Sequence, residues 1–135
     1  MKRVWTSIAV AVTIAMSGTA LGCGVCIEDK VAVTYDHAVV HAAMASHRQV
    51  VFVALDGRDA ARAGARIVAA ASAVKGVQRD SVRYAASPPA FSFALAGGAV
   101  PGKAVAAFRT AVAGMDVRMT PIRLMRDGAL VAAPD

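Results

Sequence analysis

Aromatic and acidic residues are scarce in this sequence. Aromatic residues make up 5% of its 135 positions, and Asp and Glu together number nine. Hydrophobic residues reach 57%, but most of them are alanine and valine, so we expect a folded core of small side chains. This length allows one domain of ordinary size, and the apolar content excludes a disordered chain.

Motifs typical of enzymes and nucleic-acid-binding proteins are also absent. The formal charge is +6, but the arginines are scattered and no aromatic residues lie among them, so we expect no nucleic-acid partner. The sequence has no phosphate-binding loop, no dinucleotide fingerprint and no Ser-His-Asp order with local support. We therefore predict a binding protein and not an enzyme.

Cysteine and histidine are few, and all five of them fall within residues 23–47. Two residues separate Cys23 from Cys26, and three separate His37 from His41. The first spacing places two thiolates around one ion, and the second places two imidazoles on one face of a helix. Soft thiolates combined with imidazoles suit Cu(I) or Zn(II), so these four residues are the predicted metal ligands.

Residues 28–48 are predicted to form a single helix that carries both histidines. Apolar residues recur every three or four positions, and neither proline nor glycine interrupts the run. Acidic residues at its start and basic residues at its end suit the helix dipole. Tyr35 and Asp36 are then close enough to orient an imidazole.

The first 22 residues have the three parts of a secretory signal peptide. Lys2 and Arg3 form the positive start, an apolar run follows over 4–16, and residues 17–22 are small enough for cleavage. An uncleaved anchor helix is the alternative, but several Ser, Thr and Gly residues weaken it. We expect export to the periplasm or cell envelope and a mature chain that begins at Cys23.

Residues 19–23 also resemble the bacterial lipobox, in which the cysteine is lipidated and becomes the new N-terminus. A lipidated Cys23 has no thiol left, so it would be neither a metal ligand nor a disulfide partner. In an exported protein, Cys23 and Cys26 could instead form a small-loop disulfide. These alternatives remain open from the sequence.

Residues 49–126 are predicted to alternate between strands and helices. An apolar run over 50–55 predicts a buried strand, and 58–74 and 101–113 predict helices. Residues 77–86, 90–96 and 116–125 complete a β-α-β-β-α-β order, the ferredoxin-like arrangement, with residues 127–135 as a tail. The fold class is α+β, with two helices on one face of a four-stranded antiparallel sheet.

Residues 50–124 resemble the heavy-metal-associated domain of copper chaperones and metal-pumping ATPases. Those domains begin with a strand that ends in Gly-Met-Thr-Cys-x-x-Cys, followed by a helix that closes with Gly-Val. Counting from Gly57, the two cysteine positions fall on Ala60 and Ala63, Ile67 takes a core position, and residues 76–77 supply the Gly-Val pair. Residues 113–115 are similar to the glycine turn after the second helix of the family.

The resemblance implies a copper-handling ancestry, but Ala60 and Ala63 supply no thiolate. The metal site of the family is therefore either lost or moved to Cys23 and Cys26. If the alignment at Gly57 is correct, restoring both cysteines should create a Cu(I) site there.

Two functions follow from these residues. The first is an exported envelope protein that binds or delivers a soft metal ion, with copper expected, through the segment 23–48. The second is a module without metal that binds another envelope protein, with its N-terminus either lipidated at Cys23, which would be its only membrane anchor, or closed by a Cys23–Cys26 disulfide. A thiol-disulfide exchange role is disfavoured, because that motif normally follows a strand inside a βαβ unit.

Overall fold

The apolar run 50–55 forms the centre of the protein. In the computed structural model, which describes residues 26–134, it belongs to strand β1 (Gln49–Asp56). Every residue of β1 except Asp56 is buried. A strand is buried on both faces only when other elements cover both sides of its sheet, and here helices do so.

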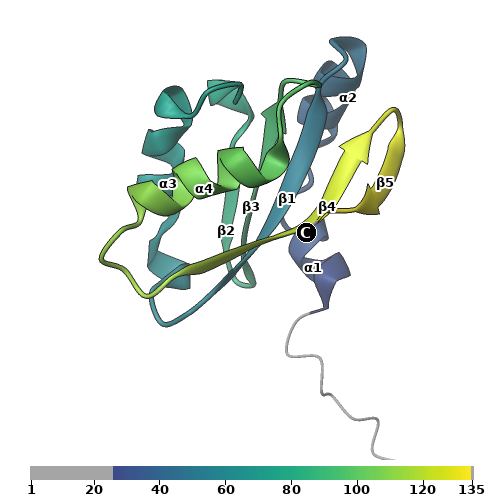
Figure 1. The fold of residues 1–135 in the computed structure, drawn as a ribbon. Coiled ribbons are helices and arrows are strands. Elements are labelled where there is room, and N and C mark those ends of the chain that lie inside the picture. Colours follow the sequence, from purple (N-terminus) through teal and green to yellow (C-terminus); the bar gives the residue numbers. More distant parts are fainter. Residues whose placement is uncertain (1–25, 135) are drawn as a thin grey trace, which may run out of the picture.

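The described strands form one antiparallel sheet in the order β2-β3-β1-β4-β5 (Figure 1). β1 pairs with β3 (Pro89–Leu95) on one side and with β4 (Arg118–Arg126) on the other. The edge strands are β2 (Arg83–Ala86) and β5 (Ala129–Ala132). The mixed helix and strand content confirms the α+β class.

The fifth strand, β5, contradicts the prediction of a tail over residues 127–135. Asp127 and Gly128 both have positive φ angles, of 51° and 78°. Two such residues form the tight turn that suits the twist of a hairpin, and β5 returns along β4. The Asp-Gly pair was the signal for this hairpin in the sequence.

The first face of the sheet is covered by α3 (Gly64–Ala70) and α4 (Pro101–Ala111). Phe108 of α4 packs against Phe91 and Phe93 of β3, with ring centroids 5.0 Å from each. All four phenylalanines of the chain are fully buried. Of the 27 buried hydrophobic residues in the described range, 17 are alanine or valine, which agrees with the predicted core of small side chains, and the few large rings are concentrated within it.

Two predicted elements on this side are shorter than expected. The helix over 58–74 consists of α3 flanked by 3-10 turns at Ala60–Arg62 and Ala71–Ala73. The strand over 77–86 reduces to β2, preceded by a 3-10 turn at Arg79–Ser81. The Ser81 hydroxyl accepts a hydrogen bond from the Ala94 amide at 2.8 Å, which replaces a strand partner there.

The second face is covered by two short helices, α1 (Ile27–Ala32) and α2 (His37–Ala45). Val31, Val40 and Ala43 from these helices pack on a cluster of residues from the sheet. That cluster consists of Val50, Phe52, Ala54, Ala94 and Ile122. The segment before β1 is therefore part of the core.

None of the helices within residues 26–134 is long and apolar enough to cross a bilayer.

The single helix predicted over 28–48 was wrong, because the chain turns at residues 33–36. The Ser92 hydroxyl donates a hydrogen bond to the carbonyl of the buried Thr34 at 2.8 Å, and the Tyr35 ring stacks on Phe52. Asp36 then begins α2, and its carboxylate accepts hydrogen bonds from the amides of Ala38 and Val39. These contacts with the sheet and the new N-cap end one helix and start another.

Asp36 also makes stability depend on pH. Its hydrogen bond from Arg83 Nε, at 2.8 Å, is the main cause that holds the pKa of Asp36 below its ordinary value of 3.8. A carboxylate with a lowered folded pKa stabilises the fold above its unfolded pKa, and this contribution is lost as pH falls through the folded pKa. We expect Asp36→Asn to lower the melting temperature at pH 7 and to match the wild type near pH 2.

Thermal unfolding at a series of pH values tests this expectation. Asp36→Asn keeps an oxygen for the N-cap, whereas Asp36→Ala removes it and should remain less stable at low pH too. Asp29→Asn is the matched control, because Asp29 is exposed and has no ion pair in the described part of the chain. If the difference in melting temperature between Asp36→Asn and the wild type stays constant from pH 7 to pH 2, the ionised Asp36 carboxylate is not the cause of the pH dependence.

Candidate metal-binding residues

His37 and His41 lie side by side on the exposed surface of α2. His37 is the first residue of the helix and His41 follows one turn later, so both rings are on the same face. Their ring centroids are 6.3 Å apart, and both side chains are exposed. Rotation about their side-chain bonds could direct one nitrogen of each ring toward a shared ion, as the spacing predicts.

Cys26 lies at the start of α1, where it is the N-cap residue and half-buried. Cys23, its predicted partner, lies outside the described residues, as does the predicted signal peptide. Cys26 thus lies one residue before a helix whose Val31 is buried against the sheet. Its backbone carbonyl accepts hydrogen bonds from the amides of Asp29 and Lys30.

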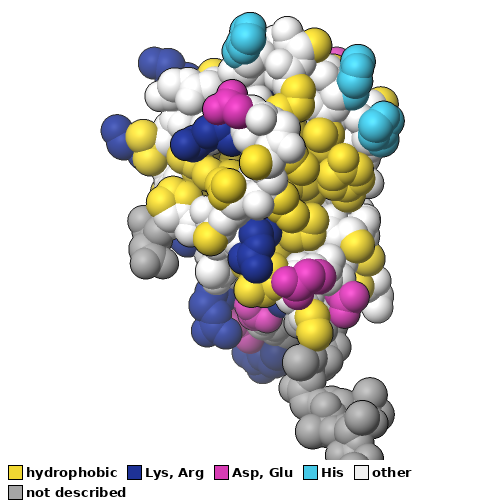
Figure 2. Space-filling view, turned by 90° about the vertical axis from the view of Figure 1, so that its right-hand side faces the viewer, with side chains coloured by type: hydrophobic (Ala, Val, Ile, Leu, Met, Phe, Trp, Pro, Cys, Tyr) yellow, Lys and Arg dark blue, Asp and Glu magenta, His cyan; other side chains and the backbone are white. Residues whose placement is uncertain are grey.

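The cysteine and the histidine pair are not brought together. α1 and α2 lie toward opposite ends of the molecule in Figure 1, and the histidine side chains gather at one end in Figure 2. Within residues 26–134 no group of three or more His, Cys, Asp or Glu side chains is placed to hold a metal ion. The turn at residues 33–36 accounts for this separation.

Tyr35 and Asp36 have roles other than the predicted orientation of an imidazole. Tyr35 stacks on Phe52 with ring centroids 6.3 Å apart and an interplanar angle of 3°. The Asp36 carboxylate caps α2 and pairs with Arg83. Both side chains therefore fix the position of α2 on the sheet.

Ala60 and Ala63, at the cysteine positions of the resembled family, are part of the core. Their exposed fractions are 2% and 0%. The Tyr84 hydroxyl donates a hydrogen bond to the Ala60 carbonyl at 2.8 Å, and a Cβ added at Gly64 would collide with the Tyr84 ring. Cysteines restored at these two positions would therefore be buried in the core, and a Cu(I) site there stays a prediction.

The loop that precedes Ala60 is closed by a network of charges. The Asp116 carboxylate accepts hydrogen bonds from the amide and Nε of Arg58, and the Asp59 carboxylate accepts from the Asp116 amide and from Arg62. Hydrogen bonding to Arg58 lowers the pKa of Asp116, and the Asp116 amide, followed by Arg62, lowers that of Asp59. Arg58 and Arg62 fall within the range 58–74 that was predicted as a helix, and no local pattern in the sequence indicates this network.

The network joins the loop after β1 to the loop before β4. Both carboxylates are engaged by guanidinium and amide groups, so this end of the sheet is a closed structural junction.

Comparison with protein-family models, with curated proteins and with solved structures finds no match for this chain.

Proposed function

We propose that this chain is an exported cell-envelope protein that binds a soft metal ion. Cu(I) is the preferred ion, and Zn(II) is the alternative. The thiolates of Cys23 and Cys26 are the main ligands. The observation that carries the proposal is the position of Cys26, half-exposed at the first residue before α1. A ligand that is half-exposed at this point can be reached by a partner that donates or accepts the ion.

His37 and His41 form a separate, weaker site in this proposal. Their separation from α1 supports two sites in place of one four-ligand site. Two imidazole nitrogens on one helix leave the remaining coordination positions to water, which suits a loosely held divalent ion. Two thiolates suffice for Cu(I), which is the softer ion.

A ferredoxin-like ancestry is part of the same proposal. Strands β2-β3-β1-β4 have the strand order of that fold, with α3 between β1 and β2 and α4 between β3 and β4. α1, α2 and β5 are then additions to it. The burial of Ala60 and Ala63 supports the view that metal binding, if inherited from heavy-metal-associated domains, has moved to the N-terminal cysteines.

Cu(I) titration of the reduced protein, produced from the complete sequence, tests this proposal. We expect Cys26→Ser to lower the Cu(I) affinity by about 100-fold or more, since even residues that only support a ligand change affinity by about 10- to 100-fold. His37→Ala with His41→Ala should leave Cu(I) affinity within about threefold but weaken Zn(II) binding, and His47→Ala is the matched control. Unchanged Cu(I) affinity in Cys26→Ser would refute the proposal.

The alternative is a protein-interaction module that is lipidated at Cys23, and one observation favours it. Ile27, Tyr35 and Leu130 are 39–47% exposed and line a groove of about 190 Å³ between α1 and β5. Figure 2 shows hydrophobic side chains gathered on this side of the molecule. Intact mass decides between the two: a gain from diacylglycerol and acyl groups supports lipidation and removes Cys23 as a ligand.

A further inference from the structure

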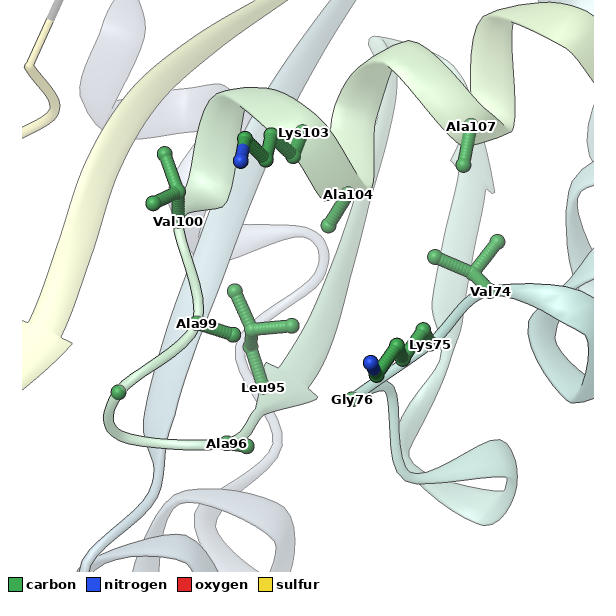
Figure 3. A pocket seen from close by; sticks show the side chains of 11 residues that line it. Val74, Lys75, Gly76, Leu95, Ala96, Ala99, Val100, Lys103, Ala104 and Ala107 are labelled. Carbon is green, nitrogen blue, oxygen red and sulfur yellow. The ribbon is translucent and has the colours of Figure 1, made fainter.

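A second cavity lies on the opposite side of the sheet, between the end of the α3 segment and the start of α4. Its volume is about 540 Å³, within the range of small-molecule sites. Leu95 and Ala99 lie on one side of the cavity, Val74 lies across from them, and Ala104 projects toward the space from α4 (Figure 3). The lining is mostly apolar, and the cavity is open to solvent on one side. The remaining lining residues are Gly76, Ala96, Gly98, Val100 and Ala107, together with two lysines.

Those two lysines, Lys75 and Lys103, give the cavity its charge. Lys75 follows Val74 at the end of one wall, and Lys103 lies in the first turn of α4. No acidic residue lines the cavity. Two positive side chains therefore flank an apolar space without a negative counterpart.

The absence of partners for these lysines is unusual in this protein. Six of the eight acidic residues in the described range form ion pairs with basic side chains. In the same range, four basic side chains have neither a hydrogen bond nor an ion pair, and two of these line this cavity. The four are Arg48, Lys75, Lys103 and Arg118.

The start of α4 adds to the positive potential. Its N-cap residue, Val100, has no side chain that can accept a hydrogen bond, and the first turn contains no acidic residue. The positive end of the helix dipole is thus left uncompensated beside Lys103. This supports the charge of the lysine pair but is not needed for it.

We propose that this cavity binds an amphipathic organic anion, a carboxylate with a hydrocarbon chain. The carboxylate lies between the ammonium groups of Lys75 and Lys103, and the hydrocarbon chain packs on Leu95, Ala99 and Ala104. Each CH₂ group that is buried against the apolar lining adds to the affinity, so a body of about eight carbons gives measurable binding. This binding is independent of the proposed metal site.

Titration with octanoate, followed by amide chemical shifts of the protein produced from the complete sequence, tests the proposal. We expect saturable shifts concentrated at Gly76, Gly98 and Ala99. Lys75→Gln with Lys103→Gln should weaken binding by about tenfold or more, the size expected for loss of charge-assisted hydrogen bonds. Ala107→Leu should also weaken it, because Ala107 is exposed and a larger side chain there fills the cavity without disturbing the core.

Arg48→Gln with Arg118→Gln is the matched control. It removes the same two charges from side chains that do not line the cavity, so octanoate affinity should stay within about twofold if the lysines act locally. Octanol, which has no charge, and acetate, which has no apolar body, should each bind more weakly than octanoate. Equal losses in the two double variants, equal binding of octanol, or no saturable shift at the cavity would each overturn the proposal.

Discussion

Replacing Phe108 with alanine should lower the free energy of unfolding by about 3–5 kcal/mol, the usual cost of deleting a buried ring. Phe108 is fully buried and contacts both Phe91 and Phe93. It is the large side chain by which α4 packs on the sheet, and its neighbours on the helix, Ala104 and Val105, are too small to fill the space it leaves. Typical domains have only about 5–15 kcal/mol of stability, so this variant should be near the limit of folding.

Urea unfolding followed by far-ultraviolet circular dichroism measures this loss. Thr110→Ala is the control on the same helix, because Thr110 is exposed and its hydroxyl bonds only to the Ala106 carbonyl within α4. We expect the control to stay within about 0.5 kcal/mol of the wild type. A loss below about 1 kcal/mol in Phe108→Ala would show that α4 does not depend on this ring for its place on the sheet.

Gly57→Ala should have the second largest effect, a loss of about 2 kcal/mol or more, since strained backbone alone costs about 1–3 kcal/mol. Gly57 has a φ angle of +114°, which side chains rarely tolerate. An added Cβ would overlap the carbonyl oxygen of Asp116 and lie 2.9 Å from its carbonyl carbon. The Asp59 amide holds that carbonyl at 3.1 Å, so the backbone cannot move aside without breaking the junction.

Gly102→Ala is the matched glycine replacement, and we expect it to raise the stability of the protein where Gly57→Ala lowers it. Gly102 is in the first turn of α4, and an added Cβ would meet no atom within 4 Å. Because alanine restricts the unfolded chain, this variant should be more stable by about 0.4–1 kcal/mol. Thermal unfolding of both variants measures the two changes in stability. A Gly57→Ala protein as stable as the wild type would show that Gly57 does not approach the Asp116 carbonyl closely.

The sequence was sufficient to predict a helix or strand where a local pattern of residues determines that element. The continuous run over 50–55 predicts a buried strand, and Pro101 together with the apolar spacing after it predicts α4, whereas the placement of helices on the second face of the sheet was not predicted. The turn at 33–36 was not predictable in this way. Its causes are Ser92 and Phe52, which lie elsewhere in the chain and meet Thr34 and Tyr35 only after folding.

The same limit applies to the candidate sites. His37 and His41 are four positions apart in one helix, so their side-by-side placement was predictable from the spacing. The distance between Cys26 and these histidines was not predictable, because it depends on the turn between α1 and α2. Lys75 and Lys103 are 28 positions apart, and nothing local relates them. Only the packing of α4 beside the α3 segment brings them to one cavity.

The central position of β1 determines when the protein can fold during synthesis. Val51 pairs with Phe93 on one side and with Leu124 on the other, which the ribosome adds 42 and 73 residues later. Pairings between such distant residues form slowly. α1 and α2 are made before β1, yet the surface they cover includes Ile122 and is complete only when β4 has been added. These two helices therefore depend on one of the last described strands, and the nascent chain must keep their apolar sides out of other contacts until then.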